Sequence, residues 1–174
     1  MFGFVLISAI TLMHIYVFWR AASVPVLRRY VSRKLLIGAG LVLWAIFLLG
    51  RVHGHHGIGP LAKASEFFGM NWMAALFLVF VSLLAMDLVT GFGFLMPSQA
   101  PSLRGIALVA GLVLSLIALF QGLRPPVVQD YEVYLPGLAE EMDGTVLVAM
   151  SDLHLGNLLD ERWLEARVAQ VQAQ

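Results

Sequence analysis

Two side chains that could bind a metal ion, Asp152 and His154, follow a short apolar run in the sequence. The run, Val146 to Met150, contains β-branched residues and no polar one, which favours a strand covered on both faces over an amphipathic helix. If the chain stays extended past Met150, residues two apart point the same way, so the carboxylate and the imidazole face one side. Both groups bind divalent cations. The pattern therefore predicts a metal site directly after this strand.

The residues around the motif predict the start of a soluble domain that would position it. Arg124 to Pro126 should stop a helix and begin a linker. Tyr131 to Leu135 alternates apolar and polar residues, as a half-buried strand does. Turns are expected at Pro136-Gly137 and at Asp143-Gly144. After the motif, Asp160 is expected to cap the N-terminus of a helix.

The spelling SDLHLG at residues 151 to 156 resembles the first motif of the calcineurin-like metallophosphoesterases, and residues 124 to 174 resemble the membrane-anchored bacterial branch of that family. The resemblance implies a fold of four transmembrane helices followed by the first strands and helix of an α/β metallophosphoesterase sandwich. It also implies hydrolysis of a phosphate ester at two divalent cations (manganese, iron or zinc). Asp152 and His154 would bind one of them, while Ser151 and Asn157 would at most contact the substrate or orient a ligand.

The composition is that of a membrane protein, because 60% of the 174 residues are hydrophobic and only 13% are charged. The formal net charge is zero, but most basic residues lie in the first half and most acidic residues lie after residue 129. The absence of cysteine excludes disulfides and thiolate metal sites. Nucleic-acid binding has no support, since the basic residues flank apolar spans, where lipid headgroups and topology account for them.

Four apolar stretches are long enough to cross a bilayer. They are Phe2 to Trp19, Leu35 to Gly50, Trp72 to Met96 and Gly105 to Phe120. The stretch from Arg20 to Lys34 is basic and contains no acid, so we expect it in the cytoplasm. Four spans then place both termini on the outer face of a bacterial inner membrane. Gly38 and Gly40 in the second span would allow a neighbouring helix to approach closely.

Two further features suggest other functions. Asp87 is the only carboxylate inside a predicted span; we expect a packing role, satisfied by snorkelling or by a hydrogen bond from a neighbouring helix, rather than transport. His53, His55 and His56 lie in a predicted polar loop, Arg51 to Asn71, and could carry a metal or cofactor. Asp87 and the count of four helices support the alternative of a non-catalytic integral membrane protein or a small transporter component, whereas the three histidines support a metal or cofactor carrier.

The predicted organisation has three parts: a transmembrane domain (residues 1–123), a linker with a first strand (124–144) and the truncated start of a metallophosphoesterase domain (145–174). Two ligands cannot hold a two-metal centre. The further motifs of the family do not follow His154 in this sequence, so we expect an N-terminal part that is inactive alone. The expected partners are the lipid bilayer and a phosphate ester at the membrane surface, with lipid-linked esters as candidates.

Overall fold

The structure is a computed structural model that describes residues 2–54, 57–156 and 158–173. The chain divides into two compact units, a helical unit (Met1–Leu123) and a C-terminal unit (Arg124–Gln174). The elements in chain order are α1 (Phe2–Ala21), α2 (Pro25–Tyr30), α3 (Arg33–Leu49), η1 (Gly50–Gly54), α4 (Pro60–Val89), η2 (Gly91–Gly93), α5 (Ala100–Gly122), η3 (Glu140–Met142) and α6 (Glu161–Gln172).

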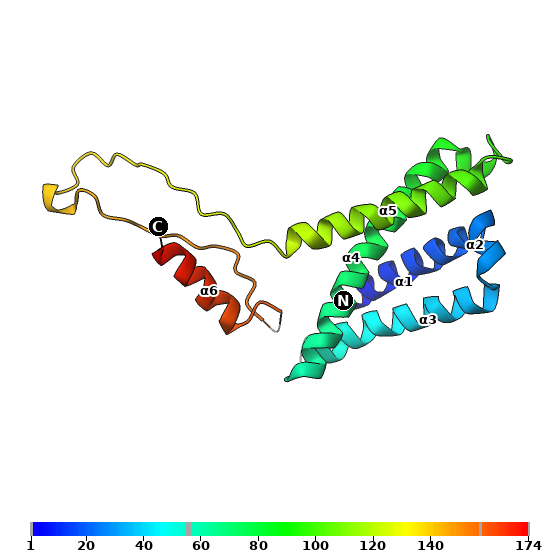
Figure 1. Ribbon diagram of the computed structural model, residues 1–174, viewed down its shortest axis with the longest axis horizontal. Coiled ribbons are helices and arrows are strands. Elements are labelled where there is room, and N and C mark those ends of the chain that lie inside the picture. Colours follow the sequence, from blue (N-terminus) through cyan, green and yellow to red (C-terminus); the bar gives the residue numbers. More distant parts are fainter. Residues whose placement is uncertain (1, 55–56, 157, 174) are drawn as a thin grey trace. The chain divides into compact units, whose positions relative to one another are not determined.

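Four helices in the described part of the chain are long and apolar enough to cross a membrane, which fits an integral membrane protein. They span Gly3–Ala21, Arg33–Gly54, Pro60–Val89 and Ala100–Gly122. Figure 1 shows α1 and α3 side by side and α5 packed along α4. Large apolar side chains such as Leu41 and Leu116 are exposed on the outside of the unit. In a bilayer these side chains contact lipid tails rather than water.

The loop expected between the second and third spans is shorter than predicted. α3 continues into the π-helical turn η1 as far as Gly54, and α4 already begins at Pro60, so most of the predicted loop from Arg51 to Asn71 is helix. Proline suits the first position of a helix, because its fixed φ is helical and it lacks an N–H that would have no partner there. α4 ends at Val89 rather than near Met96, because Gly91, Phe92 and Gly93 all have positive φ.

Glycines bring the helices of this unit into backbone contact. A Cβ added to Gly111 of α5 would lie 2.7 Å from the Cα of Val79 in α4, and one added to Gly69 of α4 would lie 2.9 Å from the Cα of Gly50. Gly40 lies beneath the ring of Phe18 in α1 and allows the close approach that we expected, whereas an added Cβ at Gly38 would have no atom within 4 Å, so the expectation is wrong for Gly38. Small residues serve this purpose in membrane helices, where close packing contributes much of the association energy.

Other contacts fill the centre of the helical unit. Phe47, Leu76 and Leu83 are completely buried, and Ile10, Val17 and Ala107 pack against them. These side chains come from all four long helices. The helical unit therefore has one shared core rather than separate hairpins.

The predicted α/β sandwich is wrong for this structure, because the described part of the C-terminal unit contains no strand. The segments 127–135 and 145–150 are irregular and make no ladder of backbone hydrogen bonds. Val146 and Leu147, expected in a covered strand, are 84% and 92% exposed. An extended segment becomes a strand only when another segment satisfies its backbone N–H and C=O groups, and none does so here.

Local features of the C-terminal unit agree with the sequence. The chain turns at Pro136-Gly137 and at Asp143-Gly144, where both glycines have positive φ. The carboxylate of Asp160 accepts a hydrogen bond from the backbone N–H of Trp163 at 3.3 Å and caps α6. These predictions are confirmed because turns and caps depend on neighbouring residues only.

We predict that Gly111→Ala lowers the free energy of unfolding of the helical unit by about 1–3 kcal/mol, since the new methyl group meets the backbone of α4. Gly38→Ala is the matched control: no atom lies within 4 Å of its added Cβ, so the better helix propensity of alanine should raise stability by up to about 1 kcal/mol. Chemical unfolding in detergent micelles measures both. Equal effects of the two substitutions would contradict the close α4–α5 contact.

Candidate functional site

The most highly organised polar site in the described residues is a buried ionic cluster around Asp87. We define the Asp87 cluster as Tyr16, Arg20, Asp87 and Arg104. Nε of Arg20 lies 2.6 Å from Oδ2 of Asp87, and Nε of Arg104 donates a hydrogen bond to Oδ1 at 2.8 Å. The hydroxyl of Tyr16 donates to Oδ2 at 2.5 Å. The Asp87 side chain is fully buried, so its charge is balanced by protein groups alone.

Three helices position the cluster. Tyr16 and Arg20 are four residues apart on α1 and therefore share one face. Asp87 lies in the last turn of α4, and Arg104 lies in the second turn of α5. The cluster consequently joins α1, α4 and α5. It lies at the end of the helical unit where α1 leads into α3 and α4 leads into α5.

Arg104 also holds the connection between α4 and α5. Its Nη2 donates to the carbonyl oxygen of Phe92 at 3.0 Å, and its Nη1 donates to Oγ of Ser23 at 3.4 Å. Phe92 has φ 58°, which is unusual for a bulky residue. The bond from Arg104 is one of the contacts that maintain this conformation.

Arg20 forms an ion pair with the carboxylate of Asp87. Its Nε–H does not have the geometry of a hydrogen bond to that carboxylate. Its guanidinium also lies over aromatic rings, 4.1 Å from the centre of Trp19, 5.6 Å from that of Tyr16 and 5.9 Å from that of Phe92. Cation–π attraction adds to the ion pair at such distances. The second cation of the cluster is thus stabilised by aromatic rings as well as by Asp87.

This arrangement leaves Asp87 little capacity for other ligands. Two guanidinium groups and one hydroxyl approach its two oxygens. A metal ion would have to compete with two fixed positive charges. The hydrogen bond expected from a neighbouring helix is confirmed, since Tyr16 of α1 donates it. The ion pairs with Arg20 and Arg104 go beyond that expectation, because the sequence predicts the basic residues beside lipid headgroups. The sequence does contain a signal for these ion pairs, because Arg20, Asp87 and Arg104 all lie on the same predicted side of the bilayer.

The predicted metal ligands in the C-terminal unit are both exposed. Asp152 and His154 make no hydrogen bond or ion pair within the described residues, and Ser151 is exposed as well. The φ values of Asp152 and His154 are 53° and 45°, so the chain is not extended at these residues. The alternation of an extended chain, which was expected to point both side chains to one side, is therefore absent. Asn157 lies outside the described residues. No group of three or more His, Asp or Glu side chains suited to a metal occurs in the described part of the chain.

Of the three histidines in the predicted loop, the structure describes only His53. His53 belongs to η1, whereas His55 and His56 lie outside the described residues. The cofactor-carrier hypothesis therefore stays a prediction.

We predict that Asp87→Ala lowers the free energy of unfolding by about 3–5 kcal/mol, because it leaves two buried guanidinium groups without an anion. Tyr16→Phe removes one hydrogen bond to a charged group and should cost about 1.5–3 kcal/mol. Thermal and chemical unfolding in lipid nanodiscs measure both losses.

The double variant Asp87→Ala/Arg104→Ala provides the control. It removes one cation together with the anion, so its cost should be smaller than the sum of the two single substitutions. Additive costs, or unchanged unfolding of Asp87→Ala, would show that the cluster does not hold the helices together.

Comparison with known proteins gave no match to a family model, to a curated protein or to a solved structure.

Proposed function

We propose that this chain is the membrane-anchored part of a metal-dependent phosphoesterase, in which Asp152 and His154 supply ligands to a divalent cation. The observation that carries the proposal is the SDLHLG run, with an unpartnered carboxylate and imidazole two residues apart. The four apolar helices of the other unit are consistent with an anchor. A phosphate ester is the proposed substrate.

The distribution of ionisable groups favours the C-terminal unit as the place of chemistry. In the helical unit, Asp87 is held by Arg20 and Arg104, and His14 is buried with its Nε2 2.9 Å from the carbonyl oxygen of Gly40. In the C-terminal unit, Asp152 and His154 are open to solvent. Groups that are free and exposed can take up a metal without breaking existing bonds.

The carboxylate of Asp152 and the imidazole of His154 are suitable types of metal ligand, but two ligands are too few for a centre with two cations. A carboxylate oxygen and an imidazole nitrogen suit manganese, iron or zinc. Two divalent cations, when bound, polarise the oxygens of a phosphate ester and lower the pKa of a bound water. Asp152 would contribute negative charge to this centre, and neutral His154 would contribute a directional lone pair. The remaining ligands have to come from residues other than those of the Asp87 cluster, which are already paired.

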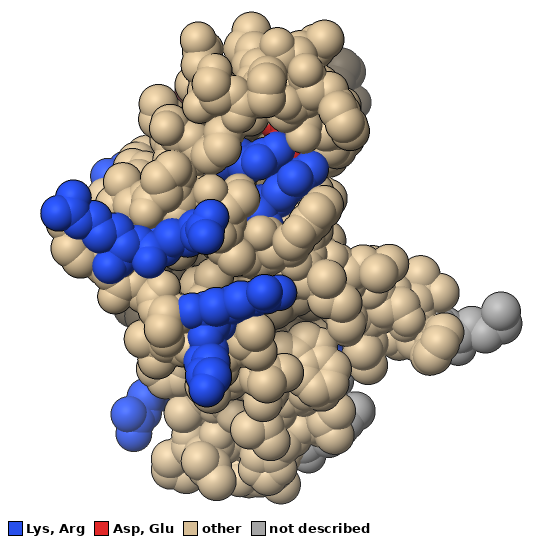
Figure 2. Space-filling view, turned by 90° about the vertical axis from the view of Figure 1, so that its right-hand side faces the viewer, with Lys and Arg blue, Asp and Glu red and all other residues tan. Residues whose placement is uncertain are grey.

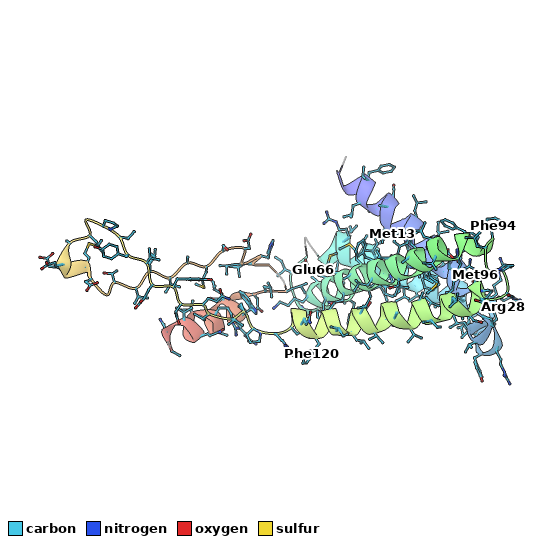
Figure 3. All side chains as sticks on the ribbon, turned by 90° about the horizontal axis from the view of Figure 1, so that it is seen from above. Met13, Arg28, Glu66, Phe94, Met96 and Phe120 are labelled. Atoms are coloured by element: carbon cyan, nitrogen blue, oxygen red, sulfur yellow. The ribbon has the colours of Figure 1, made fainter. Side chains whose placement is uncertain are left out.

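The proposed orientation places the C-terminal unit on the outer face. Arg28, Phe94 and Met96 lie at one end of the helical unit, and Glu66 and Phe120 lie at the other (Figure 3). The end with Arg28 is rich in Lys and Arg (Figure 2), and such ends remain in the cytoplasm. Phe120 at the opposite end leads to the linker. A substrate at the outer membrane surface, including a lipid-linked phosphate ester, would then be within reach.

We predict that the purified chain binds Mn²⁺ weakly and that Asp152→Ala or His154→Ala abolishes this binding, because each removes one of two neighbouring ligands. Electron paramagnetic resonance of the ion measures bound and free Mn²⁺. The chain alone should not hydrolyse a generic phosphodiester, since two ligands do not hold two cations. Metal-dependent hydrolysis that His154→Ala abolishes would show that the chain already contains a complete centre.

The triple variant His53→Ala/His55→Ala/His56→Ala is the matched control, because it removes the other group of possible ligands. It should keep the Mn²⁺ signal of the wild type. Loss of metal only in this variant would favour the carrier hypothesis, and an unchanged signal in all variants would favour a membrane protein without metal chemistry.

We predict that a cysteine introduced at Asp143 reacts with a membrane-impermeant maleimide in intact cells, because four spans and an inner basic loop place it outside. The sequence contains no cysteine, so the label reports this position alone. A cysteine at Arg29 is the control and should react only after lysis. The reverse result would invert the proposed orientation.

A further inference from the structure

The end of the helical unit where α1 leads into α2 and α3 contains an open cavity of about 470 Å³. Its lining includes Trp19 near the end of α1, Ser23 just after α1, Arg28 from α2, Ser32, which caps α3, and Arg33, the first residue of α3. A cavity lined by guanidinium groups and hydroxyls next to an indole ring suits an anionic headgroup at the membrane interface.

A second cavity, of about 480 Å³, continues from the first along α1 and α3. The two share Trp19, Ala22, Arg33 and Leu36, so they form one groove. The lining of the second part is largely apolar and includes Ile15, Phe18, Ile37, Leu41 and Trp44. The groove therefore has a basic end at the membrane interface and an apolar part that runs along α1 and α3 toward the middle of the membrane. Only an amphiphilic occupant matches both parts.

The positive charge in this groove is not neutralised by the protein. Arg28 and Arg33 are exposed and make no ion pair in the described residues, and no acid lies between Arg20 and Lys34. The one nearby carboxylate, Asp87, is occupied by Arg20 and Arg104. Figure 2 shows this face with many Lys and Arg side chains and very little acidic surface.

We propose that the groove between α1 and α3 is a binding site for one anionic phospholipid of the bilayer. The phosphate lies between Arg28 and Arg33, and an acyl chain follows the apolar course past Ile37 and Trp44. A free phosphate would match the basic end but would leave the apolar course unfilled. The lipid lies along both α1 and α3, which contact each other through Gly40 with His14 and Phe18 and through a hydrogen bond from Nε1 of Trp44 to Oγ1 of Thr11 at 3.0 Å.

Quenching of tryptophan fluorescence by brominated acyl chains tests the site in the full chain. In a background with Trp72→Phe and Trp163→Phe, the two remaining indoles, Trp19 and Trp44, both line the groove. Nanodiscs of phosphatidylcholine receive a small fraction of either brominated phosphatidylglycerol or brominated phosphatidylcholine. We expect stronger quenching by the anionic lipid at the same mole fraction. Equal quenching by both lipids would overturn the proposal.

A pair of double variants separates a site from general surface attraction. Arg28→Gln/Arg33→Gln should lower the preference for the anionic lipid about tenfold or more. Arg29→Gln/Lys34→Gln removes the same charge from the same stretch but does not alter the lining, so it should keep most of the preference. Equal losses in both variants would show that a diffuse positive surface, and not the groove, attracts the lipid.

Two further measurements test whether the variants are folded and whether the groove binds phosphate without a lipid. Unfolding in pure phosphatidylcholine establishes that both double variants are folded; if one is not, the wild-type comparison of the two brominated lipids decides alone. Inorganic phosphate added in excess should leave the quenching by phosphatidylglycerol unchanged. Complete reversal by phosphate would identify the basic end as a phosphate site without a bound lipid and would overturn the proposal.

Discussion

The buried carboxylate of Asp87 is the group on which the arrangement of the helical unit depends. An uncompensated charge at this depth would cost several kcal/mol, so the helices must pack in a way that brings cations to it. Arg20 from α1 and Arg104 from α5 do so, and Tyr16 completes the set. Any packing that separated α1 or α5 from the end of α4 would deprive the buried carboxylate of Asp87 of one of its two cations.

Close helix contacts act together with this charge pairing. Gly111 and Gly69 let α5 and α3 approach the backbone of α4, and Gly40 accommodates the ring of Phe18. These contacts restrict the register of the helices, because only glycine fits at each of them. The bonds to Asp87 restrict the same register by a second means, since the two arginines and the carboxylate must meet.

The two units use apolar residues in opposite ways. In the helical unit, exposed side chains such as Leu41 and Leu116 have lipid as their solvent and need no protein partner. In the C-terminal unit, Val146 and Leu147 are just as exposed but sit in a segment without backbone partners. Apolar side chains exposed to water do not stabilise a fold. The segment before SDLHLG therefore has the composition of a covered strand without the neighbours that would cover it.

The sequence by itself determined what depends on adjacent residues: four long apolar helices, the two turns of the C-terminal unit and the cap at Asp160. Tertiary structure decided the rest. Asp87 meets Tyr16 across 71 positions and Arg104 across 17, and no local pattern reports such pairs. Gly40 rather than Gly38 contacts α1, because only Gly40 faces that helix. The expected strands failed for the same reason, since pairing requires a distant segment and propensity alone cannot supply it.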